Sequence, residues 1–346
     1  MVENKIRVSD FISQTLSRIG VKYVYGIMGG GASGLNDGFI KNKSIKYICT
    51  HHEQGAGYAA CGEAKVTRKL SVVNPTTGCG GANCITPLLD AWQDSLPVMF
   101  ISGNVKVDQC SSVINKRNDC NIRKYGVQES DIISTVKSLT KFAKLVENAD
   151  ETPEILKEAI EKALSPRMGP VWVDIPSDIQ HAYIDYPFNF SFDFNHDYGS
   201  APINLSKLNS AKRPLVLAGY GVFLSGQSEA FKKFIEKNNL PFVTSYLGID
   251  LLPYEHDLNL GSIGIKGSRA GNFAIQNCDY LLILGCSLNC SHTGYDEKLF
   301  SPNSYKTQID IDSNEFKKNK INIDEFFECD LGVFFNNVTF WLGKQN

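Results

Sequence analysis

Short apolar runs alternate with helical segments along the whole chain, and this alternation most constrains the fold. In the first half, the runs that we predict to be buried strands cover residues 23–27, 45–49, 70–74, 98–102, 142–146 and 171–175. In the second half they cover residues 214–222 (running into a glycine turn), 241–245, 280–285 and 305–312. Strands that alternate with helices form parallel sheets with helices on both faces. We therefore predict an α/β protein with two doubly wound parallel-sheet domains.

The alternation fails between residues 177 and 205, where aromatic residues are interleaved with polar residues and a proline. We predict that this stretch is an ordered linker. The first domain then covers residues 1–190, with the linker from about residue 177, and the second covers residues 191–346. A chain of 346 residues has the length expected of two domains, and its 42% hydrophobic residues can fill two cores.

Charge and hydropathy exclude several classes of function. The net charge of -2 offers no basic face for nucleic acid. The first ten residues lack the apolar core of a secretory signal, and the longest apolar run, residues 280–286, is too short to cross a membrane. The ten cysteines do not have the spacing of zinc sites, so we expect reduced thiols and no metal ligands. We predict a cytoplasmic protein without nucleic-acid or membrane partners.

One acidic residue, Glu53, lies where a predicted strand ends and a helix of small residues begins. It follows the strand at residues 45–49, and the Ala- and Gly-rich residues 55–62 would let its helix pack closely on a flat surface. A second strand, turn and helix follow at residues 70–92, so two such junctions feed one predicted crevice. An acid in the first turn of a helix also stabilises the helix dipole by about 0.3–1 kcal/mol. A purely structural role for Glu53 is therefore the alternative.

Five further sequence blocks follow in a fixed order, at residues 25–31, 76–83, 90–103, 127–129 and 168–176. Together with His52-Glu53-Gln54, their order and spacing resemble the N-terminal, aminopyrimidine-binding part of thiamine-diphosphate enzymes of the acetolactate synthase type. In that family the H-E-Q tripeptide carries the glutamate that holds the cofactor ring nitrogen. The resemblance therefore implies that Glu53 is catalytic.

The resemblance also implies roles for other residues of the first half. It assigns cofactor binding to Gly29, Gly30, Thr77, Gly78 and Asn83, and substrate binding to Gly31, Gln128 and Lys141. Each has a plain structural alternative: a turn with positive φ for the glycines, a helix cap for the threonine and asparagine, and a solvated surface position for the glutamine and lysine. The segment of residues 106–125 is longer than the family's corresponding substrate-entry stretch. Because of this difference, the resemblance does not identify the substrate.

The second half resembles the central domain of the same family, where some acetolactate synthases hold FAD. Its candidate flavin or nucleotide residues are Gly219, Gly221, Asp310 and Asp312. The family's two flavin-contacting arginines are Ser287 and Ser291 in this chain, which argues against a flavin. The alternative is a structural domain that binds no cofactor and only packs against, and separates, other domains.

The family's third domain carries a Gly-Asp-Gly motif that holds Mg²⁺ and the cofactor diphosphate, and this tripeptide does not occur in the sequence. We therefore expect a diphosphate-binding domain elsewhere or on a partner chain. The chain is then a piece of a longer protein, half of a split enzyme, or a homologue without chemistry.

With such a partner we predict a homodimer or larger assembly. Its reaction would be decarboxylation and carboligation of a small-molecule 2-oxo acid, with pyruvate as the default donor, as in branched-chain amino acid biosynthesis. The alternative is a noncatalytic binding or regulatory protein that keeps the scaffold. A plain nucleotide-binding protein is a third and weaker interpretation, because no G-x-G-x-x-G motif follows a predicted strand.

Overall fold

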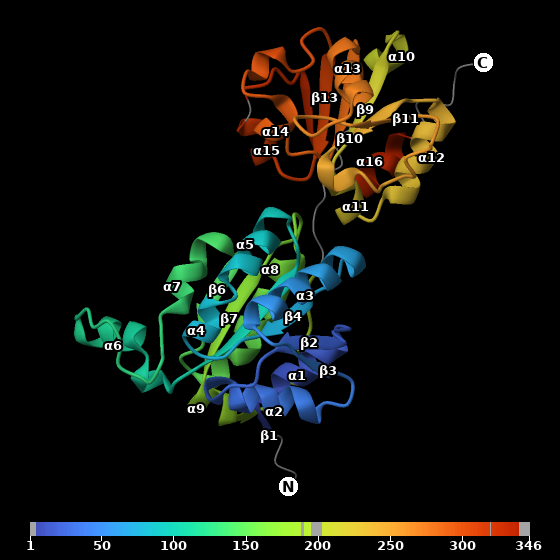
Figure 1. Cartoon of the computed structure of the whole chain (residues 1–346). Helices are drawn as coiled ribbons and strands as arrows, with labels where there is room; N and C mark the ends of the chain where they lie inside the picture. Colours follow the sequence, from blue (N-terminus) through green and yellow to red (C-terminus); the bar gives the residue numbers. More distant parts are fainter. Residues whose placement is uncertain (1–4, 188–189, 195–202, 319, 339–346) are drawn as a thin grey trace. The chain divides into compact units, whose positions relative to one another are not determined.

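The computed structural model describes residues 5–187, 190–194, 203–318 and 320–338 of the chain. The chain divides into two compact units, Met1–Asn195 and His196–Asn346, called unit 1 and unit 2. Figure 1 shows that each unit is a sheet with helices on both sides. In the described ranges, no helix is both long enough and apolar enough to span a bilayer.

The sheet of unit 1 contains six parallel strands in the order β3-β2-β4-β5-β7-β6. Its strands are β2 (Tyr23–Gly26), β3 (Lys46–Cys49), β4 (Ser71–Asn74), β5 (Val98–Asn104), β6 (Phe142–Leu145) and β7 (Val171–Pro176). Each coincides with a predicted strand. Every residue of β4, β5 and β7 is buried, as parallel strands covered on both faces require.

Helices cover both faces of this sheet. On one face, the core packs against α1 (Val8–Arg18), α2 (Ser33–Lys41) and α8 (Thr152–Leu164). The other face carries α3 (Glu53–Thr67), α4 (Cys79–Ala82), α5 (Ile85–Gln93) and α7 (Ile132–Val136). The small residues of α3 allow close packing, as the sequence predicts. A Cβ atom on Gly57 would lie only 2.7 Å from the Cβ atom of Pro87 in α5.

The strand order of unit 1 reverses at β2, which has β3 on one side and β4 on the other. In open α/β sheets, ligands bind outside the carboxyl ends of the strands at such a switch point. The loops that follow β2, β3 and β4 all leave this edge of the sheet, because the strands are parallel. The fold therefore places the start of α3 and the glycine turns after β2 and β4 at one edge.

The predicted linker is in part regular structure. It contains α9 (Ser177–His181) and β8 (Tyr183–Asp185), and β8 pairs antiparallel with β1 (Lys5–Arg7) near the N-terminus. The sequence pattern predicts none of these three elements, because each has only three to five residues and β1 and β8 pair across most of unit 1. Residues 188–189 and 195–202 of the predicted linker lie outside the described residues.

The sheet of unit 2 is also parallel, with the strand order β11-β10-β9-β12-β13-β14. Its strands are β9 (Pro214–Ala218), β10 (Phe242–Thr244), β11 (Asn259–Ser262), β12 (Tyr280–Leu284), β13 (Tyr305–Asp310) and β14 (Glu325–Glu328). Its helices are α10 (Ser206–Ser210), α11 (Tyr220–Leu224), α12 (Ser228–Asn238), α13 (Arg269–Asn277), α14 (Cys290–Thr293), α15 (Asn314–Lys317) and α16 (Leu331–Val338). The prediction of two doubly wound α/β domains is thus confirmed, although β11 and β14 were not predicted.

Candidate functional site

Glu53 is the first residue of α3, four residues after the end of β3. The helix start is fixed by His52, whose Nδ1 accepts a hydrogen bond from the backbone N–H of Gln54 at 3.1 Å. The hydroxyl of Thr50 donates to the carbonyl of His52 at 2.8 Å and shapes the preceding turn. These local bonds hold Glu53 at the carboxyl edge of the sheet, where its side chain is half-buried.

The Glu53 carboxylate is oriented by a single neighbour. The Nδ2 atom of Asn83 donates to its Oε2 atom at 2.9 Å. Among the residues that the structure describes, no other side chain or backbone group donates to this carboxylate. Its Oε1 atom lies 3.2 Å from the place that a Cβ atom on Gly80 would take. Oε1 therefore remains available to a ligand beside a position that has no side chain.

The glycine turns after β2 and β4 interlock around this carboxylate. A Cβ atom on Gly80 would lie 2.7 Å from the methyl of Thr76, and one on Gly29 would also meet the Thr76 side chain. A Cβ atom on Gly31 would overlap the hydroxyl of Thr77, which donates to the carbonyl of Gly103 at 3.2 Å. These three positions therefore accept only glycine, because the threonine side chains pack directly against their backbone.

Three residues predicted for this edge remain, and the structure brings two of them, Gly78 and Gln128, into contact. Gly78 has φ +61°, and a Cβ atom there would overlap the carbonyl oxygen of Gln128. Gln128 is exposed and itself has φ +58°. Gly30 begins a short 3₁₀ helix and has open space where a Cβ would be. Glu53 and its predicted neighbours at this edge are together called the Glu53 site. These neighbours are Gly29, Gly30, Gly31, Thr77, Gly78, Asn83 and Gln128.

Lys141 does not join the Glu53 site. It directly precedes β6, so it lies at the amino edge of the parallel sheet, whereas Glu53 lies at the carboxyl edge. Its ammonium donates to the hydroxyl of Ser165 at 2.5 Å and to the carbonyls of Ser165 and Arg167 at 3.2 and 3.0 Å. Burial, with the nearby cations of Lys162 and Arg167, lowers the pKa of Lys141 to about 8. The structure thus places Lys141 as a cap on the carboxyl end of α8.

Two buried polar residues support the site, and the sequence analysis gave them no role. The amide of Gln180 donates to the carbonyls of Gly31 and Ile175, each at 2.7 Å, and accepts from the N–H of Gly34 at 3.0 Å. It therefore ties the glycine turn after β2 to the end of β7. In the sequence, only the position of this glutamine, four residues after Asp174-Ile175-Pro176, could have indicated its role.

The second buried residue is Asp174 in β7. It accepts hydrogen bonds from Ser102 at 2.6 Å and from Asn104 at 2.7 Å, both in β5. The indole N–H of Trp172 donates to the same Ser102 hydroxyl at 2.8 Å. Burial raises the pKa of Asp174 to about 7, and the hydrogen bonds only partly offset this rise. Asp174 thus joins two strands beneath the site.

The candidate nucleotide residues of unit 2 shape its own turns. The N–H of Gly221 donates to the carbonyl of Gly285 at 3.0 Å, and a Cβ atom on Gly219 would lie 2.5 Å from the Cα atom of Cys286. Asp310 accepts from the N–H of Asp312 at 3.1 Å. The two positions to which the resemblance gives flavin-contacting arginines are Ser287 and Ser291 in this chain.

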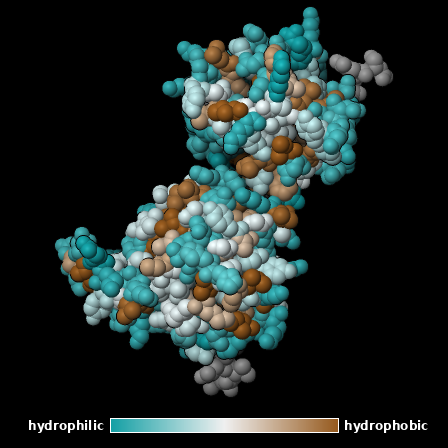
Figure 2. All heavy atoms as spheres, viewed as in Figure 1, coloured by the Kyte–Doolittle hydropathy of each residue, from teal (hydrophilic) through white to brown (hydrophobic). Residues whose placement is uncertain are grey.

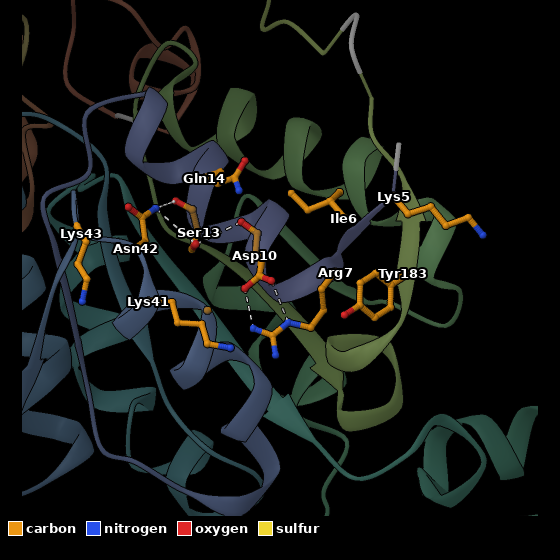
Figure 3. Close-up of a pocket in the computed structure, with 11 residues that line it drawn as sticks. Lys5, Ile6, Arg7, Asp10, Ser13, Gln14, Lys41, Asn42, Lys43 and Tyr183 are labelled. Atoms are coloured by element: carbon orange, nitrogen blue, oxygen red, sulfur yellow. Dashed lines mark hydrogen bonds and ion pairs between the residues drawn. The ribbon is translucent and has the colours of Figure 1, made fainter. Parts of the chain in front are cut away.

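Unit 1 also has a cavity of about 510 Å³ between α1, the end of α2 and the β1–β8 pair (Figure 3). None of the Glu53 site residues lines it. Its guanidinium, from Arg7, is bound by Asp10 and Asp37, each at 2.6 Å. The cavity is therefore separate from the Glu53 site, and the Arg7 side chain that lines it is already paired.

Two protein-family models match the chain. The model of the thiamine pyrophosphate enzyme N-terminal TPP binding domain matches residues 6–135, and that of the thiamine pyrophosphate enzyme central domain matches residues 204–335. The first match contains Glu53, Asn83 and the glycine turns.

Curated relatives agree with these models. The chain is 32% identical over 317 residues to the acetolactate synthase large subunit of Lactococcus lactis subsp. lactis, covering 90% of this chain and 53% of that protein. It is 32% identical over 321 residues to a probable acetolactate synthase large subunit of Methanocaldococcus jannaschii, covering 90% and 52%. For the isozyme 1 large subunit of Escherichia coli K12 the identity is 31% over 320 residues, covering 90% and 54%.

The chain thus spans about half the length of these relatives. Both halves of the chain match models of one family, in the order that the fold shows. The chain therefore belongs to the thiamine pyrophosphate enzymes and carries their N-terminal TPP-binding and central domains.

Proposed function

We propose that unit 1 supplies the pyrimidine-binding half of a thiamine diphosphate site, with Glu53 as its catalytic acid and base. One observation carries this proposal. The Glu53 carboxylate is held by Asn83 through Oε2, while Oε1 stays available beside Gly80 at the switch point of the sheet. A ring nitrogen needs such an acceptor, oriented in advance and not already bonded.

Each residue of the Glu53 site then has a defined task. Glu53 holds or releases a proton at the ring nitrogen, and Asn83 keeps the carboxylate pointed at it. The turns with Gly29, Gly30, Thr77 and Gly78 let the backbone approach the ring closely. Gly31 and Gln128 lie beside these turns and form the substrate side. Thiamine diphosphate, when bound, supplies the carbon nucleophile that adds to the keto carbon of a 2-oxo acid.

The relatives' names suggest the reaction. They are acetolactate synthase large subunits, so we propose a 2-oxo acid decarboxylase and carboligase with pyruvate as the default donor. Mg²⁺ and the cofactor diphosphate would be bound by a diphosphate-binding domain, on this protein beyond the matched regions or on a partner. We include no flavin, because unit 2 offers its phosphates no arginine at the two expected positions.

Homodimerisation belongs to the same proposal. The helices α3 and α5 expose Tyr58, Val66, Leu89 and Trp92 to 44%, 79%, 39% and 40%. Figure 2 shows hydrophobic residues at the surface of unit 1. Apolar surface left in water costs about 25 cal/mol per Å². A second copy covering α3 and α5 would remove this cost and bury the half-exposed Glu53.

The experiment is turnover of pyruvate by the complete assembly, with the diphosphate-binding domain present, for wild type and Glu53→Gln. We expect the variant to lose at least about a hundredfold in kcat, the lower end of general acid–base catalysis. Glu63→Gln, the same change at the other glutamate of α3, is the matched control and should keep its activity. Near-full activity of Glu53→Gln would refute the proposal. Cofactor binding without turnover in the wild type would instead favour the noncatalytic alternative.

A further inference from the structure

A long connecting segment, residues 106–128, leaves the carboxyl edge of the unit 1 sheet and is rich in basic residues. It is called the arm. It leaves after β5 and returns just before α7, and it contains α6 (Ser111–Asn118). Figure 1 shows α6 standing out from the sheet and helices of unit 1. The arm includes the stretch that is longer than its counterpart in the resembling family. Its position at this edge calls for a functional explanation.

The arm is firmly folded although it projects. Glu129 is buried at its base and accepts hydrogen bonds from the hydroxyl of Ser111 at 3.0 Å and the N–H of Tyr125 at 2.9 Å. Asn115 accepts from the N–H of Ile122 at 2.7 Å and donates to its carbonyl at 3.1 Å. These bonds join the part of the arm that leaves β5 to the part that returns to α7, so the backbone that carries the charged residues is held in place.

The returning limb reaches the Glu53 site. Gln128, the last residue of the arm, presents its carbonyl oxygen to Gly78 so closely that a Cβ atom there would overlap it. Arg123 and Lys124 precede Gln128 by five and four residues. An extended chain spans at most about 3.6 Å per residue, so their Cα atoms lie within about 18 Å of the Gln128 Cα atom.

The arm is a concentration of positive charge on a chain with net charge -2. It carries Lys106, Lys116, Arg117, Arg123 and Lys124 against Asp108 and Asp119. Lys116 is paired with Glu147 at 3.2 Å. Arg117, Arg123 and Lys124 are exposed, and they take part in none of the ion pairs found among the described residues. Three unpaired cations therefore stand on a rigid element that ends at the site.

We propose that this arm steers the anionic substrate to the Glu53 site. This inference rests on the proposed function, because a 2-oxo acid carries a carboxylate and would gain from a positive field around its path. Fixed charges beside a site raise the local concentration of oppositely charged substrate and its on-rate, and salt screens the effect. At about 0.01 M ionic strength the screening length is about 30 Å, which exceeds the distance of about 18 Å that bounds Arg123 and Lys124 from Gln128.

A thiol probe tests the field without any turnover. Cys79 is exposed and adjacent to Gly78, so its reactivity reports the potential at the site. The background has Cys49, Cys120 and Cys290, the other exposed cysteines, replaced by serine. The reaction rate of Cys79 with the anionic disulfide 5,5′-dithiobis(2-nitrobenzoate) is divided by its rate with the neutral 4,4′-dithiodipyridine. Because both reagents react with the same thiol, the ratio cancels any difference between variants in how accessible or how ionised the Cys79 thiol is.

The arm variant combines Arg117→Gln, Arg123→Gln and Lys124→Gln. We expect its ratio to fall about threefold or more at about 0.01 M salt and to match wild type at about 0.5 M. The control combines Lys22→Gln, Lys46→Gln and Lys69→Gln, the same charge change at or just before β2, β3 and β4 on the amino edge. The control should leave the ratio unchanged. An equal ratio in wild type and arm variant, or an equal fall in the control, overturns the proposal.

Kinetics of the complete assembly separate this inference from the proposed function. The arm variant should lower kcat/KM for pyruvate at low salt and leave kcat unchanged, with no loss when neutral acetaldehyde is varied as the acceptor. If the arm variant loses more kcat/KM for an acceptor that bears a phosphate than for pyruvate, the arm serves a phosphate group rather than a carboxylate. If wild type turns over no 2-oxo acid but the thiol ratio still falls, steering of anions stands and the proposed reaction fails.

Discussion

At the scale of single residues, the site depends on the pairing of Glu53 with Asn83. The asparagine fixes one carboxylate oxygen and thereby aims the other. Gly80 beside it keeps that second oxygen reachable. The orientation of the acid is thus built into unit 1 before any cofactor binds, and preorganised groups need no rearrangement during the reaction.

The first prediction concerns Asn83→Ala. Losing a hydrogen bond to a charged group costs about 1.5–3 kcal/mol, so we expect at least about tenfold weaker binding of thiamine diphosphate. Calorimetric titration of the complete assembly with the cofactor and Mg²⁺ measures this. Asn118→Ala, at the exposed end of α6, is the control and should bind as wild type does. Equal affinity of Asn83→Ala and wild type would show that the pairing does not orient the acid.

The sequence predicts part of this residue-scale picture. Glu53 lies in a short local pattern where a strand ends and a helix begins, so the sequence indicates it directly. Asn83 follows the end of α4 and was assigned by the resemblance. Gln180 and Asp174 act across strands and turns that meet only in the folded chain. Lys141 was named on resemblance alone, and it lies at the other edge because it precedes its strand rather than following it. The predicted strand of residues 142–146 already placed Lys141 at the amino end of a strand, so the sequence pattern itself argued against the role that the resemblance implied.

At the scale of elements, β5 and β7 are joined by Asp174. Its carboxyl group is fully enclosed and relies on Ser102 and Asn104 of the neighbouring strand. Burial disfavours the charged form, which is why the pKa of Asp174 rises to about 7. The strand pair beneath the site should therefore respond to pH.

The second prediction follows from the sign of that shift. The unfolded chain loses this proton near pH 4, whereas the folded chain keeps it to about pH 7. The stabilisation is therefore complete below about pH 4 and is lost as pH rises through about 7. In urea unfolding between pH 5 and 7.5, wild type should lose more stability than Asp174→Asn, whose amide does not titrate. Asp119→Asn, at the exposed end of α6, should keep the wild-type slope. Parallel curves for wild type and Asp174→Asn would contradict the account.

Strands that form a clear apolar run were predicted, and strands without such a run were not. The six strands of the unit 1 sheet are apolar runs flanked by helices, and burial on both faces makes such runs visible in the sequence. By contrast, β1 and β8 have three residues each and pair across most of unit 1. The strand β11, with the sequence Asn-Leu-Gly-Ser, contains one large apolar side chain and gives no apolar run. The strand β14 is flanked by glutamates, so its two phenylalanines give no clear apolar run.

At the scale of the whole molecule, two parallel sheets follow one another along the chain. The matched family models fall one on each unit. The residues of the Glu53 site all belong to unit 1, and the proposed function adds a diphosphate-binding domain to complete it. In the proposed homodimer, a second copy would cover the exposed apolar side chains of α3 and α5.

The third prediction tests that contact. Leu89→Glu combined with Trp92→Glu places two charges on the exposed face of α5, and we expect the dimer to dissociate into monomers. Sedimentation velocity at micromolar concentration measures the change. Ile249→Glu combined with Ile265→Glu alters two exposed apolar residues of unit 2 in the same way and should leave the dimer intact. A double variant of α5 that sediments as wild type would place the interface elsewhere.

The most direct measurement of the central claim is exchange of the C2 proton of thiamine diphosphate for deuterium, followed by NMR in the complete assembly. The exchange rate reports whether Glu53 activates the cofactor, and the measurement does not require the substrate to be known. With Glu53 the exchange should be fast, and with Glu53→Gln it should slow by at least about a hundredfold while the cofactor stays bound. An equal exchange rate in both proteins would contradict the role that we propose for Glu53.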